Sequence, residues 1–187
     1  ENTVLFKGTV NGTHALTIGN NANATNVTFE KSVGSVNKLA SLDVKGNATA
    51  NEAIFTTGNI AVGGVANVTE VTSSGGAISV TGDATASGTI SARGNISFGG
   101  NADVAGVTST SGVISFDGDA KASGAISAGG DITFGGTADV AGVTSTSGVI
   151  SFDGDATASG TISAGGDITF GGTADVAEVT STGGAIS

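Results

Sequence analysis

The chain of 187 residues contains no proline, cysteine, methionine, tryptophan or tyrosine. Without cysteine it forms no disulfide and has no thiol nucleophile or thiolate metal ligand. One histidine (His14) and one arginine (Arg93) leave few of the side chains that usually serve as general acids and bases. We therefore expect no enzymatic activity, no catalytic residues, no metal site and no bound cofactor.

Positive charge is also scarce, because 6 lysine and arginine residues stand against 16 acidic residues and the net charge is −10. Such a surface repels phosphate backbones and anionic lipid head groups, so we expect no binding to nucleic acid. No apolar run approaches the roughly 20 residues of a membrane-spanning helix, and we expect no membrane insertion by this segment.

Glycine is abundant instead, with 33 residues. The absence of proline argues against collagen, and the sequence repeats internally. Residues 96–131 and 132–167 differ at only four of 36 positions, a looser copy occupies 60–95, and a further copy begins at Ile168. A repeat of this length is typical of stacked, solenoid-like architectures.

A shorter unit of six residues, which we call a hexad, lies inside the repeat. Residues 150–167 read ISFDGD, ATASGT and ISAGGD, with apolar first and third positions and glycine fifth. Between Gly46 and Gly184, glycine occupies 21 of the 24 fifth positions. Phenylalanine recurs in every third hexad, and valine extends this series towards the N-terminus; the positions are Val44, Val62, Val80, Phe98, Phe116, Phe134, Phe152 and Phe170.

Each hexad predicts a three-residue strand followed by a corner, where glycine permits a positive φ. Three strands and three corners make a triangular coil of about 18 residues, and coils stacked about 4.8 Å apart pair their strands in parallel. The predicted fold is an all-β, single-stranded triangular parallel β-solenoid with a 36-residue double-coil repeat. Its core has isoleucine and phenylalanine on one side and small residues on the second. On the third side, isoleucine and alanine alternate with pairs of threonine.

The first residues follow this pattern less closely. Phe29 and Val44 stand two and a half hexads apart, where later coils use three, which predicts a shortened side or a cut corner. We expect one continuous domain with irregular coils over 1–41 and regular coils over 42–187. Its open last coil predicts that the rod continues beyond Ser187 or stacks end to end with another copy.

Residues 3–49 contain VTF followed by VGS, and then LASLDVKGNAT, while residues 163–170 read SAGGDITF. These segments resemble the filamentous-haemagglutinin-like and autotransporter-passenger group of repetitive bacterial exoproteins. The resemblance implies a secreted or surface-displayed β-helix that serves as a stalk, adhesin or matrix fibre, with a host or surface receptor or glycan as partner. It implies no particular functional residue.

Two corners carry paired carboxylates, Asp117 with Asp119 and Asp153 with Asp155. Calcium prefers such oxygen ligands but needs six to eight of them, and the coil between these corners supplies only glycine and threonine. The sequence therefore favours solvated corners over a Ca²⁺ site. A further set of corner residues is expected to form local Asx turns; it comprises Asn59, Asn95, Asp131 and Asp167.

Short runs of hydroxyl residues recur once in each double-coil repeat, at 72–74, 108–110, 144–146 and 180–182. The hexad register places Thr108 and Thr110 inward, which predicts an internal ladder; ice binding would require them to point outward. Phe55 is expected at an outward position, as a local bulge or an exposed contact. His14 is expected to be a turn residue.

The leading functional hypothesis is a non-enzymatic extracellular rod that acts as a fibre, stalk or surface matrix element. One alternative is a ligand-binding flat face for ice or glycan. Another is a cytoskeletal filament similar to bactofilins, whose triangular coils resemble those predicted for this chain.

Overall fold

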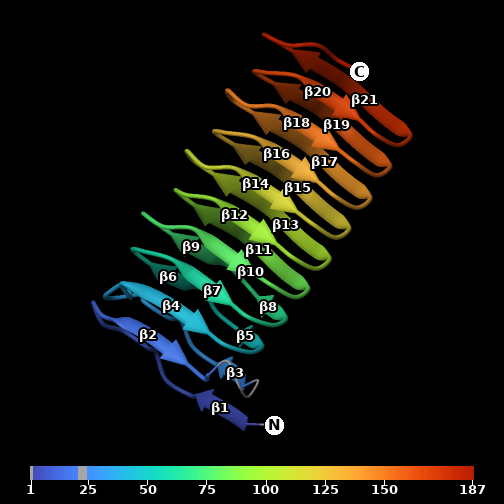
Figure 1. The fold of residues 1–187 in the computed structure, drawn as a ribbon. Helices are drawn as coiled ribbons and strands as arrows, with labels where there is room; N and C mark the ends of the chain where they lie inside the picture. The colour runs from blue at the N-terminus through green and yellow to red at the C-terminus, as the bar shows by residue number, and fades with distance from the viewer. Residues whose placement is uncertain (1, 21–24) are drawn as a thin grey trace.

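The computed structural model describes residues 2–20 and 25–187, in which all regular secondary structure is β-strand. The chain winds into a stack of coils, and its two ends lie at opposite ends of the stack (Figure 1). Strands pair in parallel with their equivalents in the neighbouring coils, which lie three hexads away in the regular part of the chain. The predicted β-solenoid is confirmed.

Side 1 of the coil is a sheet of nine strands. In spatial order these are β2 (Ala15–Ile18), β4 (Ser41–Val44), β7 (Ile60–Val62), β10 (Ile78–Val80), β12 (Ile96–Phe98), β14 (Ile114–Phe116), β16 (Ile132–Phe134), β18 (Ile150–Phe152) and β20 (Ile168–Phe170).

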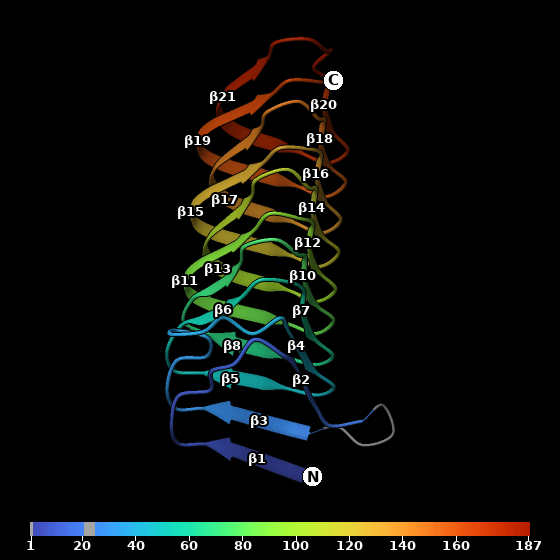
Figure 2. The same ribbon diagram turned by 90° about the vertical axis from the view of Figure 1, so that its left-hand side faces the viewer.

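Sides 2 and 3 belong to a second sheet, of twelve strands. Side 2 begins with β1 (Asn2–Phe6), β3 (Thr25–Phe29), β5 (Ala48–Ala50) and β8 (Ala66–Val68), and side 3 begins with β6 (Ile54–Thr56) and β9 (Val71–Ser73). The later strands cover both sides in one run; they are β11 (Ala84–Ala92), β13 (Ala102–Ser109), β15 (Ala120–Ala128), β17 (Ala138–Ser145), β19 (Ala156–Ala164) and β21 (Ala174–Ser181). Figure 2 shows these strands stacked along the rod.

The core of side 1 is a ladder of isoleucine beside a ladder of phenylalanine. Phe98 and Phe116 are stacked with their ring centroids 5.0 Å apart, and three further stacked pairs continue to Phe170 at 5.0, 4.7 and 5.2 Å. Val44, Val62 and Val80 continue the same row in the earlier coils. Both ladders are as the sequence predicts.

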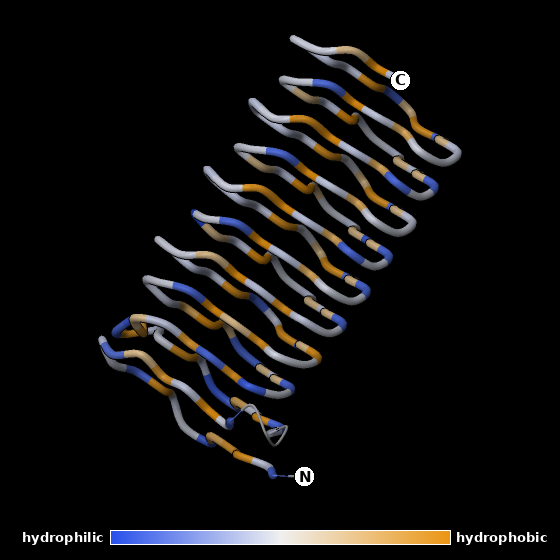
Figure 3. The backbone as a smooth tube through the Cα atoms, viewed as in Figure 1, coloured by the Kyte–Doolittle hydropathy of each residue, from blue (hydrophilic) through white to orange (hydrophobic). Residues whose placement is uncertain are grey.

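The core of side 2 is built from small residues. Ala102 pairs with Ala120, and Val104 pairs with Ala122 in the next coil, all four being buried. The narrow coil is therefore filled by large side chains from side 1 and small ones from side 2, without overpacking. Short apolar segments recur at matching places in successive coils (Figure 3).

The corner glycines are required by close stacking of the coils. A Cβ on Gly118 would lie 2.7 Å from Asn101 Oδ1 and 2.8 Å from the backbone of Gly100, one coil earlier. Among the residues described, only Gly12, Gly19 and Gly34 have a positive φ, and all three precede the regular coils. The repeated corners therefore do not use the positive φ that glycine permits.

Side 3 departs from the hexad in every second coil. Ile90 pairs with Val107, which is one residue short of three hexads, and Val107 pairs with Ile126, which is one residue beyond them. The corner between sides 2 and 3 therefore has three residues in one coil, as at 87–89, and two in the next, as at 105–106. We call the coils with the two-residue corner shifted coils; they contain β9, β13, β17 and β21.

The coils over residues 1–41 are longer than three hexads, which overturns the expected shortening. Val4 pairs with Val27, Val27 with Ala48, and Leu16 with Leu42, and each of these steps exceeds the regular coil length. Phe29 lies on side 2, in register with Ala50, so its separation from Val44 does not measure a coil length.

Candidate functional site

Side 3 carries the recurring threonines on its outer surface. Val107 and Ser109 are buried, while Thr110 is exposed and Thr108 is partly exposed. The prediction of an inward threonine ladder is therefore wrong. The two-residue corner advances the strand by one position, and in a strand this turns every side chain to the opposite face.

The middle serine of each run takes an inward, structural role that the hexad register does not predict. Ser109 Oγ donates a hydrogen bond of 2.8 Å to the carbonyl of Gly94, one coil earlier. It also accepts one of 3.0 Å from the N–H of Gly112 in its own four-residue corner. Ser73 and Ser145 repeat both bonds, so the buried hydroxyl ties each shifted coil to the coil below. The recurrence of serine two positions after an apolar residue, once in each double-coil repeat, is the signal that could have revealed this role.

The outward side chains of side 3 alternate between larger and smaller from coil to coil. Along the first row Thr108 neighbours Ser127, which neighbours Thr144. Arg93 lies at the end of side 3. Between residues 71 and 187 it is the only charged residue at the outward positions of this side. Phe55 also points outward in the regular pairing of β6 with β9, so no bulge forms there and the side chain is half-buried.

The acidic and amide residues at the corners bind the backbone of the next coil. Asp119 Oδ1 accepts a hydrogen bond of 2.8 Å from Thr137 N–H, and Asp131 Oδ1 accepts one of 2.9 Å from Val149 N–H. Further corner residues make the same contact 18 residues along, among them Asn59, Asn95, Asp155 and Asp167. The expectation of local Asx turns is wrong, because the donors belong to the following coil.

These contacts affect the acidity of two corner carboxyl groups. Hydrogen bonds from the backbone and side chain of Thr137 lower the pKa of Asp119 below its ordinary value. Hydrogen bonds from the side chain and backbone of Thr173 lower the pKa of Asp155 in the same way. Both groups are exposed, and the ionised form is the better acceptor for these donors.

The paired carboxylates considered for calcium already have partners. Asp117 Oδ1 accepts a hydrogen bond from Ser115 Oγ, while Asp119 Oδ1 binds Thr137. Over residues 2–20 and 25–187, no three His, Cys, Asp or Glu side chains are grouped so that they could bind a metal. His14 is exposed, and its carbonyl accepts a hydrogen bond from Ala40.

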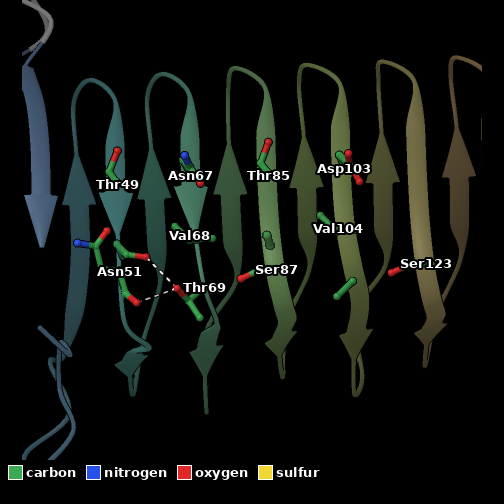
Figure 4. Close-up of a pocket in the computed structure, with 13 residues that line it drawn as sticks. Thr49, Asn51, Asn67, Val68, Thr69, Thr85, Ser87, Asp103, Val104 and Ser123 are labelled. Atoms are coloured by element: carbon green, nitrogen blue, oxygen red, sulfur yellow. Dashed lines mark hydrogen bonds between the residues drawn. The ribbon is translucent and has the colours of Figure 1, made fainter. Parts of the chain in front are cut away.

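Two shallow hollows lie on the outer surface of side 2, along the rod axis. The first, about 490 Å³, runs across β5, β8, β11 and β13, between an outer row that includes Asn67 and Thr85 and a second row that includes Asn51 and Ser87 (Figure 4). The second, about 540 Å³, lies further along the rod, where Asp103, Asp119 and Asp139 accompany Lys121. The hexad pattern does not predict these hollows.

Within the described ranges no helix is long and apolar enough to cross a membrane. Comparison with protein-family models, with curated proteins and with solved structures gives no match for this chain.

Proposed function

We propose that the protein is a rigid rod that acts as a stalk, fibre or surface matrix element outside the cell. The observation that carries this proposal is the continuity of the two parallel sheets, which connect β1 to β21 and β2 to β20 without an antiparallel pair among the described strands. A solenoid of this kind keeps its binding surfaces at a defined distance and requires no active site.

The rod resists bending because parallel strand pairing in both sheets bonds each coil to the next. The core adds stacked phenylalanine rings between 4.7 and 5.2 Å apart on side 1. The net charge of −10 keeps such a long β-structure soluble and opposes lateral aggregation. The resemblance of residues 3–49 to repetitive bacterial exoproteins supports display at a cell surface.

Stacking along the axis is part of this proposal. β1 pairs only with β3, and β21 pairs only with β19, among the described strands. A free strand edge pairs readily with another strand. A further coil, from additional chain or from a second copy, would pair with these edges and extend the rod.

The spacer role is tested by changing the length of the rod. A variant with a second copy of residues 96–131 gains two coils, so negative-stain electron microscopy should show rods longer by about 9.6 Å. The unmodified protein should give rods of roughly 45 Å, or multiples of that length if copies stack end to end. Rods that do not lengthen, or a variant that fails to fold, would contradict the proposal.

Location is tested separately on cells that produce the native protein. Brief protease treatment of intact cells should remove the epitope of an antibody against the rod, while a cytoplasmic control protein is preserved. Protection of the epitope until the cells are lysed would overturn the extracellular role and favour a cytoskeletal filament.

A second candidate function is ice binding on side 3, and the outward direction of its threonines favours it. Thr144 and Thr146 are exposed in one coil, and Thr108 and Thr110 point outward two coils earlier. Thermal-hysteresis measurements test this idea, with Thr144→Lys as the disruptive variant and Thr85→Lys on side 2 as its control. Equal freezing behaviour of all three proteins and of buffer would refute it.

A further inference from the structure

The first hollow of side 2 is lined by neutral hydrogen-bonding groups except at one end, where Asp103 lies. Its outer row contains Thr49, Asn67 and Thr85, which are in register on β5, β8 and β11. The second row, two residues further along the chain in each coil, contains Asn51, Thr69 and Ser87. Buried alanine and valine residues lie between the rows (Figure 4). The result is a shallow trough that runs parallel to the rod axis and is neutral except for Asp103 at one end.

Most polar groups of this trough are free to bind a ligand. Asn67, Thr49 and Thr85 make no side-chain hydrogen bond to any residue that the structure describes, whereas Thr69 Oγ1 donates to the carbonyls of Ala50 and Asn51. The corner residues differ in this respect, because Asn47 and Asn59 are bound to the backbone of the next coil. The trough therefore offers amide and hydroxyl groups that the fold itself does not use.

The charge around the trough selects against anionic ligands. Asp103 lies at its end, and Asp83, Asp119 and Asp139 line the neighbouring hollow, with Lys121 as the single cation. A polymer that carries uronate, sulfate or sialic acid groups would meet these carboxylates as it extended along side 2. The negative charges of the polymer and of the protein would repel each other.

We propose that this trough binds a neutral polysaccharide chain that lies along the rod axis. Every sugar of such a chain presents hydroxyl groups, and the repeat of the sugars is similar in length to the spacing of about 4.8 Å between coils. Several successive coils can therefore make equivalent contacts. Amide and hydroxyl side chains are suitable partners because they both donate and accept hydrogen bonds. This inference deepens the proposed role as a stalk or surface matrix element and rests on it.

Binding is tested by affinity gel electrophoresis of the whole protein in gels that contain a soluble polysaccharide. The neutral probes are a β-glucan, a mannan and a galactan, and the acidic probes are polygalacturonate and heparin. We expect at least one neutral probe to retard the protein and neither acidic probe to do so. Retardation by an acidic probe alone, or by none of the five, would overturn the proposal.

Two matched variants locate the site. Asn67→Glu introduces a charge between the neutral neighbours Thr49 and Thr85, and Thr144→Glu introduces one between Ser127 and Ser163 on side 3. We expect Asn67→Glu to weaken binding about tenfold or more, which corresponds to about 1.4 kcal/mol, and Thr144→Glu to bind like the unmodified protein. An equal effect of the two variants, or a loss confined to Thr144→Glu, would overturn the assignment.

A milder variant distinguishes blocking of the trough by an introduced charge from the loss of hydrogen bonds to the polysaccharide. Asn67→Ala combined with Thr85→Ala removes two free polar groups without adding charge, and it should reduce binding severalfold. Binding at full strength by this variant would overturn the proposed contacts. Rods that remain intact by electron microscopy but bind no polysaccharide would refute this inference alone and leave the spacer role in place.

Discussion

The buried serine of each shifted coil illustrates how much one side chain can determine in this fold. Ser109 is 1% exposed and is bonded both to the coil below and to its own corner. The four-residue corner that follows it has one residue more than its counterpart in the next coil. The hydroxyl therefore compensates for a local irregularity by satisfying the backbone groups that the irregularity would leave unpaired.

Replacing this serine should be costly. Ser109→Ala leaves the carbonyl of Gly94 and the N–H of Gly112 without their partner, so we expect the free energy of unfolding to fall by about 1–3 kcal/mol. Ser111→Ala is the control, because Ser111 is exposed and water can replace its bond to Arg93. Urea denaturation followed by circular dichroism measures both. Equal stabilities of the two variants would show that the buried bonds contribute little.

The lowered pKa values of Asp119 and Asp155 predict a dependence of stability on acid. A carboxyl group whose pKa is lower in the folded state stabilises it fully above the ordinary aspartate pKa of about 3.9. This contribution is lost as the pH falls from that value through the folded-state pKa. The amide of asparagine keeps an acceptor oxygen at every pH.

We therefore expect the double variant Asp119→Asn with Asp155→Asn to melt near the unmodified protein at pH 7 and above it at pH 2.5. The control, Asp103→Asn with Asp139→Asn, removes the same charge from side chains that accept no hydrogen bond from described residues. Thermal melts followed by circular dichroism between pH 7 and pH 2 measure the difference. If both double variants shift equally with pH, net charge rather than the corner bonds determines the effect.

At the scale of strands, the hexad predicts sides 1 and 2 correctly because their apolar residues have only one consistent register. The segment VTST on side 3 has two, with either Val107 and Ser109 or Thr108 and Thr110 facing inward. In a shifted coil the corner before side 3 has one residue fewer and the corner after it has one residue more. The coil length therefore stays at three hexads, and the spacing does not reveal which register is used. Burial of valine in preference to threonine is the physical reason that the structure takes the first register.

The candidate surfaces were less predictable than the core. The trough on side 2 depends on which outward side chains are left without hydrogen-bond partners, and the hexad pattern contains no such information. The first coils were mispredicted because residues 34–38 form an insertion within side 3. Val33 and Leu39 on either side of it contact the same strand, pairing with Ile54 and Thr56 of β6. Hydrophobic spacing along the chain cannot show that two residues on either side of an insertion pair with the same strand.

The phenylalanine ladder predicts a sharp contrast between two aromatic residues. Phe116 is 1% exposed and stacks on both neighbours, so Phe116→Ala should lower the free energy of unfolding by about 3–5 kcal/mol. Phe55 points outward, and Phe55→Ala should cost much less. Urea denaturation of both variants measures the difference. Similar losses would mean that the ladder contributes no more than an ordinary surface contact.

At the scale of the whole molecule, the two-coil repeat separates like charges. Asp117, Asp119 and Asp131 belong to one coil, and their equivalents Asp153, Asp155 and Asp167 lie two coils further along. The shifted coil between them has glycine, threonine and valine at these corner positions. Equivalent carboxylates are therefore about 9.6 Å apart, close to one Debye length at physiological salt, instead of about 4.8 Å.

Deleting one coil should remove this separation, whereas deleting two should preserve it. Removal of residues 132–149 brings the three carboxylates of one coil directly beside their equivalents, while removal of 132–167 keeps the alternation. Nearest-neighbour stacking alone would make the longer deletion the less stable protein. We expect repulsion to lower the melting temperature of the shorter deletion at low salt, and that temperature to rise more steeply as NaCl increases. Melts from about 10 mM to 1 M salt span screening lengths of about 30 to 3 Å. Parallel salt responses of the two deletions would show that the two-coil period has another cause, such as the alternation of the serine-bonded corners.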